Sequence, residues 1–338
     1  QHHQQQQQQH YQQQQTTTTS LHAIGVLAKR AKEMDLRKYA EGGLDDDVQE
    51  KLDIIKQYTS SDNGNDSNNK EEVVGPLQQA LTKRRGTISV VAEYKRKLDS
   101  GYVDEIFDPE ILSPIFRDNG AAAVAVMADE RMGGCTYDDV SAFVAEQSRA
   151  WAPCFVVNSD MIIDALQVAR TAACNANALT LPYGLLKDNN VFGDLLLAAQ
   201  AVGLESMAQV STADEAQGAV DAGARILVVV GVEGVEGKYA VVENLVVPDG
   251  AEVCTVAAIT ARDNGELEEI EEAWMCRDKG FNSVWVADAL YKGGNNPAEH
   301  PGAIINSMKA KSSVKYASPR ARTGKGEGAR EYLGDLLM

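Results

Sequence analysis

The run ISVVAE at residues 88–93 begins an alternation of short apolar runs and helical patterns that continues to residue 308. Eight runs have strand length and many β-branched residues: Ile88–Glu93, Ala122–Met127, Cys154–Val157, Ala178–Leu181, Ser206–Val210, Ile226–Gly231, Glu252–Ala257 and Ser283–Ala287. Helical patterns between and after them cover Tyr137–Ala150, Asp160–Ala172, Val191–Ala201, Thr212–Ala222, Glu266–Lys279 and Pro297–Met308. Strands that are apolar on both faces are typical of a parallel sheet buried under helices.

This alternation predicts an α/β fold of the (β/α)8, or TIM-barrel, class. Eight strand–helix units within about 220 residues match the usual size of such a barrel. A doubly wound open sheet is the alternative, but it ordinarily uses fewer strands and a glycine-rich first turn. Here the first strand runs into Glu93-Tyr94-Lys95-Arg96-Lys97 with no GxGxxG pattern, so the barrel is favoured.

The segments outside the barrel divide the rest of the chain. Residues 1–20 form a glutamine-rich tract that cannot bury enough apolar area to order itself, so we expect disorder. Residues 21–86 predict a helical extension, interrupted by a polar linker at 60–70. The barrel is then expected over 87–308, followed by a basic tail with a short apolar C-terminal anchor at 309–338.

Two helical patterns are expected within the extension. Leu27, Ala31, Met34 and Tyr39 recur near helical spacing before a Gly42-Gly43 break, and a second apolar periodicity follows up to residue 58. The stretch GPLQQALTKRRG at residues 75–86 predicts a further short helix with a proline near its start.

The composition excludes several classes of partner. The formal net charge of -17 leaves no general basic footprint for nucleic acid, and no apolar stretch is long enough for a membrane helix. The five widely spaced cysteines indicate buried thiols in a reducing compartment, with no metal-ligand spacing, and we expect no metal or cofactor. Residues 309–338 carry seven basic and three acidic residues, a net +4, which leaves -21 on residues 1–308.

The ends of the predicted strands decide the chemistry, because barrel active sites are built there. Titratable groups gather after the first two strands and after the last: Glu93, Lys95, Asp129, Glu130, Arg131 and Asp288. The remaining ends carry amides, hydroxyls or aliphatic groups: Ser159, Gln209, Val230, Ala258, Ile259 and Ala287. A phosphate site needs free N–H groups without a competing anion, so Asp288 disfavours an anionic ligand, and it could serve instead as the N-cap of the final helix.

Several stretches, in order, resemble one family of barrel enzymes. They are AEYKRK at 92–97, DMIID at 160–164 followed by Gln167, GLE at 203–205 with AVDAGAR at 219–225, and SVWVADALYK at 283–292. These stretches are similar to those of indole-3-glycerol phosphate synthase, and the similarity covers about residues 25–308. The resemblance implies a tryptophan-pathway carbon–carbon lyase that closes an indole ring on a ribulose-phosphate substrate.

The resemblance also implies which functional groups are present. Glu93 and Lys95 match the family's active-site residues on the first strand, whereas Ser159 stands where the catalytic lysine is expected and Gln209 where a glutamate is expected. The other departures from the family pattern are Val230 for an asparagine, Ala258-Ile259 and Ala287-Asp288 in the substrate and phosphate turns, Leu98 for a serine and Met132 for a phenylalanine. Each lost acid or base typically lowers the rate about 10²–10⁴-fold, so we expect the ancestral reaction to be absent.

Three functions remain open at this stage. The favoured hypothesis is a non-catalytic barrel that serves as a structural, assembly or regulatory subunit of a larger protein complex. The alternative is an active lyase with a site rebuilt around Glu93 and Lys95, in which Asp129, Glu130 and Arg131 take part. In the first case Glu93 and Lys95 only pair within a buried network. A small-molecule sensor using an apolar pocket is the third possibility.

The partner is expected to be a protein, without nucleic acid and without a transmembrane segment, although peripheral docking on a membrane complex is compatible with the sequence. The tail residues expected to bind it are Lys315, Arg320, Arg322, Lys325, Arg330, Tyr332, Leu333, Leu336 and Leu337. A tail that folds back on the acidic barrel is the alternative. The glutamine tract, the first residue Gln1 and the plastid location of the pathway in plants and algae favour a plastid.

Overall fold

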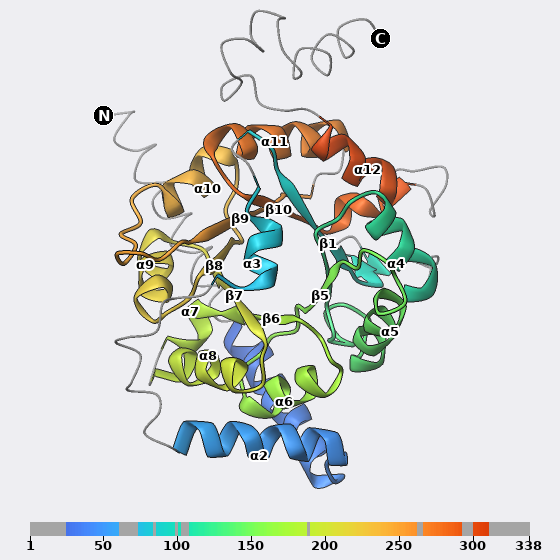
Figure 1. The fold of residues 1–338 in the computed structure, drawn as a ribbon, viewed down its shortest axis with the longest axis vertical. Coiled ribbons are helices and arrows are strands. Elements are labelled where there is room, and N and C mark those ends of the chain that lie inside the picture. The colour runs from blue at the N-terminus through green and yellow to red at the C-terminus, as the bar shows by residue number, and fades with distance from the viewer. Residues whose placement is uncertain are drawn as a thin grey trace, which may run out of the picture.

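The computed structural model describes residues 25–60, 74–83, 86–98, 101–102, 108–187, 190–261, 266–292 and 300–310. Its centre is a closed barrel of eight parallel strands in the order β1-β10-β9-β8-β7-β6-β5-β4 (Figure 1). The strands are β1 Ser89–Tyr94, β4 Ala123–Val126, β5 Phe155–Asn158, β6 Ala178–Pro182, β7 Glu205–Val210, β8 Ile226–Val229, β9 Cys254–Ala258 and β10 Ser283–Val286. All eight predicted strands are present, and the prediction of a TIM barrel is confirmed.

The barrel closes because β1 pairs with β10 on one side and with β4 on the other. Ser89 aligns with Ser283 of β10, and Val91 aligns with Ala123 of β4. A two-stranded hairpin of β2 (Lys97–Leu98) and β3 (Gly101–Tyr102) follows β1. The backbone N–H groups of Arg96 and Lys97 donate to the Gly133 carbonyl at 2.7 and 3.0 Å, so the loop after β1 is tied to the loop after β4.

Helices surround the barrel: α4 Pro109–Asp118, α5 Tyr137–Gln147, α6 Ala165–Ala173, α7 Tyr183–Leu186, α8 Val191–Ala201, α9 Ala213–Asp221, α10 Val235–Val242, α11 Glu266–Lys279 and α12 His300–Lys309. Three of them begin where a side chain caps the backbone: Thr136 before α5, Asp164 before α6 and Thr212 before α9. Three of these helices were not predicted from the sequence: α4, the four-residue α7 and α10. Helix α4 contains Pro114, and α10 follows Gly234 at φ 68°, both of which are helix-breaking signals.

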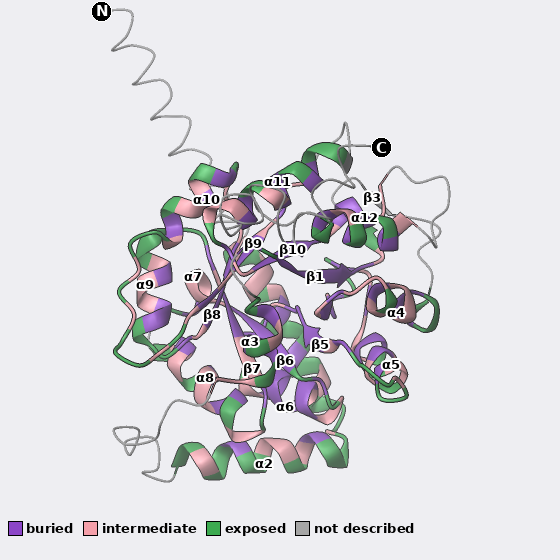
Figure 2. Cartoon of the chain, turned by 45° about the horizontal axis from the view of Figure 1, so that its top comes forward, coloured by how far each residue is buried: buried purple, intermediate pink, exposed green. Residues whose placement is uncertain are grey.

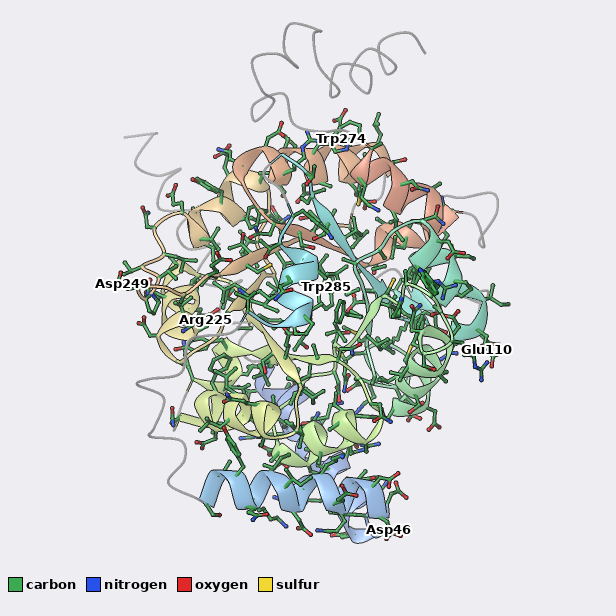
Figure 3. The ribbon with its side chains drawn as sticks, viewed as in Figure 1. Asp46, Glu110, Arg225, Asp249, Trp274 and Trp285 are labelled. Carbon is green, nitrogen blue, oxygen red and sulfur yellow. The ribbon has the colours of Figure 1, made fainter. Side chains whose placement is uncertain are left out.

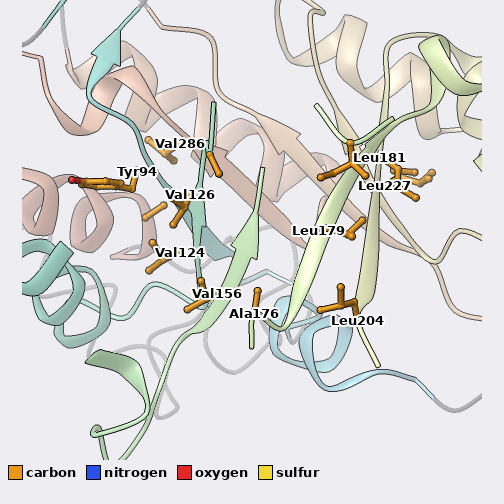
Figure 4. Packing of buried hydrophobic residues seen from close by; sticks show 14 of the residues in the cluster. Tyr94, Val124, Val126, Val156, Ala176, Leu179, Leu181, Leu204, Leu227 and Val286 are labelled. Carbon is orange, nitrogen blue, oxygen red and sulfur yellow. The ribbon is translucent and has the colours of Figure 1, made fainter. Parts of the chain in front are cut away.

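The core lies between the outer faces of the strands and the helices. Figure 4 shows Val124, Val126, Leu179, Leu181 and Leu227 in this layer. Every residue of β1, β4 and β8 is buried, as expected of strands covered on both faces. Figure 2 shows the buried residues on the strands and on the inward faces of the helices. The five cysteines carry free thiols, and all but the half-buried Cys174 are buried.

Helix α3 (Pro76–Leu81) closes the amino-terminal opening of the barrel, in front of the strands in Figure 1. Leu77 and Leu81 are fully buried and pack against interior residues that include Met207 and Trp285. The carboxylate of Glu205, at the start of β7, accepts the N–H groups of Leu77 at 2.6 Å and Gln78 at 3.1 Å. The predicted short helix is therefore present, and it ends at Leu81 because Thr82 adopts an extended backbone conformation.

The extension that precedes α3 forms two helices. One covers residues 25–41 and ends at the Gly42-Gly43 turn, and α2 (Asp46–Ser60) follows it and packs against α6 and α8 (Figure 1). Two of the apolar residues that predicted the first helix, Leu27 and Met34, lie in solvent, and its buried residues are Lys32 and Leu36. Lys32 is buried on that face because its ammonium group pairs there with Asp129 and Asp160.

Some predictions fall outside the described residues. These are the glutamine-rich tract at 1–20, the linker residues 61–70 and the tail residues 311–338 with their nine partner-binding candidates. Lys309, assigned to the tail in the sequence analysis, belongs to α12, and its Nζ donates to the Gly120 carbonyl at 2.7 Å.

Candidate functional site

The carboxyl end of β1 holds the two residues that the sequence singled out, Glu93 and Lys95. They are two positions apart and therefore project from the same face of the strand. Both side chains are buried, and Lys95 Nζ lies 4.0 Å from Glu93 Oε2. The same ammonium lies 2.5 Å from Oδ1 of Asp288, which follows β10. Lys95 is therefore held between two carboxylates that come from neighbouring strands.

Glu93 has polar neighbours on several sides. Ser159, which follows β5, donates from Oγ to Glu93 Oε1 at 3.2 Å, and the indole of Trp285 on β10 also hydrogen-bonds to the carboxylate. Figure 3 shows Trp285 near the barrel axis. Burial raises the pKa of Glu93, although the Lys95 ammonium and these hydrogen bonds oppose the shift. Titratable groups shifted by burial beside a specific charge partner occur at functional sites and also in structural ion-pair networks.

Asp288 does not cap the final helix, so that prediction is wrong. It is the first residue of a short 3-10 helix, Asp288–Leu290, whose N-cap is Ala287, and α12 begins later, at His300. Its carboxylate is buried against Lys95 at 2.5 Å and lies 3.9 Å from Nζ of Lys292. This role could not be predicted from the sequence, because Lys95 and Asp288 lie at opposite ends of the barrel sequence and meet only when β1 pairs with β10.

The other positions at which the sequence departs from the family pattern lie at the strand ends where they were expected. Gln209 is the penultimate residue of β7 and aligns with Pro182 of β6. Val230 follows β8, and its N–H donates to the Val210 carbonyl at 2.9 Å. Ala258 ends β9, and the Ile259 N–H donates to the Trp285 carbonyl at 2.8 Å. Val230 and Ala258 pack against the interior cluster that contains Trp285, so this side of the mouth is apolar.

The turn after β9 is held by a buried lysine that the sequence analysis did not identify. Lys238 of α10 donates from Nζ to Thr260 Oγ1 at 3.0 Å and forms an ion pair with Glu272 of α11. Lys238 and Glu272 are both fully buried. The contact fixes the turn after β9 to two outer helices. This turn contains Ile259, one of the positions expected from the sequence to have lost a substrate contact.

A second missed lysine, Lys32, joins the extension to the mouth. Its Nζ lies 2.6 Å from Asp160 Oδ1 and also forms an ion pair with Asp129, and all three side chains are buried. Asp160 follows β5, and Asp129 follows β4. The helix over residues 25–41 therefore lies across the carboxyl ends of these strands, and Lys29 extends the contact by donating to the Leu185 carbonyl after β6 at 3.3 Å.

The two carboxylates that bind Lys32 differ in their electrostatics. Burial raises the pKa of Asp160, while the Lys32 charge and hydrogen bonds from Lys32 and Gln167 oppose the shift. Burial also acts to raise the pKa of Asp129, but the Lys32 ammonium and the N–H groups of Met132 and Arg131 overcome it and lower that pKa. Asp129 is therefore anionic at neutral pH, and it serves the Lys32 contact.

Arg131 and Met132 do not face the cluster around Lys95 as the sequence suggested. Arg131 forms an ion pair with Asp35 and donates to the Ala31 carbonyl at 3.2 Å, both on the helix over residues 25–41. Met132 and Glu130 are exposed to solvent. Contacts thus unite Glu93, Lys95, Ser159 and Asp288 in one cluster, whereas Asp129 and Arg131 hold the extension.

The described part of the chain has neither a cluster of metal ligands nor a membrane-spanning helix. It contains no group of three or more His, Cys, Asp or Glu residues placed to hold a metal ion. None of its helices combines the length and apolarity that a membrane span requires.

A closed parallel barrel with buried charged groups at the carboxyl ends of its strands defines a TIM-barrel protein, and its candidate site lies at the end of the barrel where this fold carries active sites. The chain belongs to the indole-3-glycerol phosphate synthase family, since the model of that family matches residues 44–237. The matched segment includes Glu93, Lys95, Ser159, Gln209 and Val230 and ends before β9 and β10.

Individual relatives agree with this assignment. Indole-3-glycerol phosphate synthase of Roseiflexus sp. (strain RS-1) is 34% identical over 142 residues, which are 41% of this chain and 52% of the relative. The Leptospira interrogans enzyme is 30% identical over 152 residues, 45% of this chain and 57% of the relative. The chain thus spans about half the length of these curated relatives. Among solved structures, thiamine phosphate pyrophosphorylase from Pyrococcus furiosus is 17% identical, with a TM-score of 0.44 over 66% of this chain and 98% of that one.

Proposed function

We propose that this protein is a non-catalytic member of its family that acts as a structural, assembly or regulatory subunit of a larger protein complex. The observation that carries the proposal is the Asp288 carboxylate, buried 2.5 Å from Lys95 at the mouth of the barrel. Phosphate sites in this fold commonly lie after the seventh and eighth strands, which here are β9 and β10. A phosphate there would meet a buried anion, and the nearby cation is already neutralised.

The groups next to Glu93 support the same conclusion. Ser159, which stands where the resemblance places the catalytic lysine, donates a hydrogen bond to Glu93 but cannot act as an ammonium acid. Gln209, at the position of the expected glutamate, cannot exchange a proton. Loss of two acid–base groups lowers a rate by about 10⁴-fold or more when each contributes about 10²–10⁴. Binding energy from a phosphate anchor would be lost in addition.

The buried contacts at the mouth of the barrel hold its loops in place. Lys32 fixes the extension to the ends of β4 and β5, and Lys238 fixes the turn after β9 to α10 and α11. A scaffold benefits from such fixed loops, whereas catalytic loops commonly need to open for substrate entry. The proposal therefore assigns these lysines to architecture.

The test is an assay for indole-3-glycerol phosphate formation from the ribulose-phosphate substrate of the family. We expect no turnover above background with the wild-type chain. We also expect none with Ser159→Lys, because Gln209 and Asp288 remain. Clear wild-type turnover that Lys95→Ala abolishes would refute the non-catalytic proposal.

The second candidate is an active lyase of tryptophan biosynthesis with a rebuilt site. It is favoured by one observation: Glu93 is buried, has a raised pKa and lies 4.0 Å from Lys95. Perturbed groups of this kind gather at functional sites as well as in structural networks. The same assay separates the candidates, since only a rebuilt site loses turnover in Glu93→Gln.

The partner is proposed to be a protein, in a plastid assembly, bound through the basic tail. Truncation after Ala310 tests this, because it keeps Lys309 and its hydrogen bond to the Gly120 carbonyl at 2.7 Å. We expect the truncated chain to lose proteins that co-purify with the full chain from plastids. Unchanged co-purification would remove the tail from the proposal.

A further inference from the structure

The helix over residues 25–41 presents a stripe of side chains directed away from the barrel. Leu27, Arg30, Met34 and Lys38 are spaced by three or four residues and therefore share one helical face. This face is opposite the buried Lys32 and Leu36. Leu27 is 64% exposed and Met34 is 65% exposed, which is unusual for two large apolar side chains on one stripe.

The stripe is basic in an otherwise acidic chain. Arg30 and Lys38 lie on it and Arg37 lies beside it, and in the described part of the chain no ion pair involves any of the three. Glu33 at one edge and Glu41 at the end do not reverse the sign of the central part. With a net charge of -17 for the whole chain, this is a local cationic surface with apolar contacts on it.

Helix α11 presents a stripe of the opposite sign. Leu267, Glu271, Met275 and Asp278 are again spaced by three or four residues and lie on the outer face of the helix. Leu267 is 63% exposed and Met275 is 51% exposed. The inner face of α11 holds buried residues such as Ala273 and Cys276, so the stripe is the solvent side of an anchored helix.

The two stripes match in length and in the order of their apolar and charged residues, and their charges are opposite. Each alternates an apolar and a charged side chain, and at 1.5 Å per residue the apolar pairs are separated by about 10.5 Å in one helix and about 12 Å in the other. Arg30 and Lys38 of the first stripe correspond to Glu271 and Asp278 of the second, and Asp278 also forms an ion pair with Arg277 at 2.9 Å. Docked side by side, the apolar residues would meet and each charge would face its opposite.

The stripes cannot meet within one molecule. Helix α11 packs beside β10, α10 and α12, whereas the helix over residues 25–41 is held by residues that follow β4, β5 and β6. The strand order places β9 across the barrel from β5. Figure 1 shows α11 at the edge of the barrel opposite α2.

We propose that a second copy of this chain docks the α11 stripe on the stripe of the helix over residues 25–41. The contact is heterologous, so each docked pair keeps one free stripe of each kind, and the association continues beyond a dimer, into a ring or a chain of molecules. A single pair of helices makes a small interface, and its charges are exposed. The association is therefore concentration-dependent and weakened by salt. The inference goes beyond the proposed function and does not require it.

Sedimentation of the full chain tests the inference. At low salt we expect the average mass to rise with concentration above the monomer mass of 36.5 kDa, and to fall back in about 0.5 M salt. Arg30→Glu with Lys38→Glu reverses one stripe, and Glu271→Lys with Asp278→Lys reverses the other; each double variant should remain monomeric. Combining all four substitutions in one chain, or mixing the two double variants, should restore association.

Matched controls reverse exposed charges away from both stripes. Arg149→Glu, before β5, and Glu243→Lys, after α10, should sediment as the wild type does. A wild-type chain that stays monomeric at every concentration, or reversals that leave its association unchanged, would overturn the proposal. So would four combined substitutions that fail to restore it. Substrate turnover is measured separately, so catalysis in the assay above would remove the proposed function and leave this inference standing.

Discussion

Replacement of Lys32 by methionine should destabilise the protein by about 3–5 kcal/mol, because it removes one partner of a buried ion network and keeps the others. Lys32 Nζ lies 2.6 Å from Asp160 and pairs with Asp129, and their exposed fractions are only 2% and 8%. Methionine preserves the apolar stem of the lysine, so the loss reports the charge. Against a total stability of about 5–15 kcal/mol, the change is large.

The predicted loss depends on pH in a defined direction. Burial already raises the pKa of Asp160 in the wild type, and the Lys32 charge opposes that shift. Without Lys32 the folded-state pKa rises further above the unfolded value of about 3.9. A raised folded pKa contributes stability that is present below the unfolded pKa and is lost as pH rises through the folded pKa. The difference between Lys32→Met and wild type should therefore be largest near pH 7, shrink as pH falls through the raised folded-state pKa of Asp160, and be smallest below about pH 4.

Urea unfolding followed by circular dichroism measures this loss, and hydrogen exchange over residues 25–41 shows whether the helix detaches first. Lys56→Met is the matched control, since Lys56 is an exposed lysine of α2 whose side chain is 62% exposed. It should change stability by less than about 0.5 kcal/mol. The double variant Lys32→Met with Asp160→Asn should recover part of the loss. If Lys32→Met behaves like the Lys56 control at pH 7, the assignment of Lys32 as a structural link is wrong.

Three further predictions concern other parts of the structure. Asp288→Asn removes the carboxylate 2.5 Å from Lys95, so inorganic phosphate should raise the melting temperature of this variant in a thermal-shift assay. Phosphate should not raise the melting temperature of the wild type or of the control Asp278→Asn. Equal responses would contradict the assignment of Asp288 as an anion barrier. Glu93→Gln should gain stability relative to wild type as pH rises through the raised pKa of Glu93, because the wild type then loses the stability that the protonated Glu93 side chain contributes. A pH-independent difference in urea unfolding would show that the pKa of Glu93 is not shifted upward. Glu205→Ala should cost about 1–2 kcal/mol, because it removes the acceptor for the Leu77 and Gln78 N–H groups at the start of α3, and Glu243→Ala should have no comparable effect in the same measurement.

The positions of the eight strands could be predicted because burial under helices requires apolar side chains on both faces of each strand. That requirement is local and visible in runs such as 88–93 and 283–287. The positions of Ser159 and Gln209 at strand ends followed from the same periodicity. Helices α4 and α10 could not be predicted, because Pro114 and Gly234 are local signals that tertiary packing overrides.

The sequence by itself determined the barrel and the identity of the groups at its mouth. Only the tertiary structure decided which groups meet. Lys95 meets Asp288 because closure of the barrel pairs β1 with β10, and Lys32 meets Asp129 and Asp160 because the extension lies across β4 and β5. The charge of a side chain can be read from the sequence, whereas its partner depends on contacts between residues far apart in the chain. A buried charge is stable only with such a partner, so the structure explains why Lys32 and Asp288 are tolerated there.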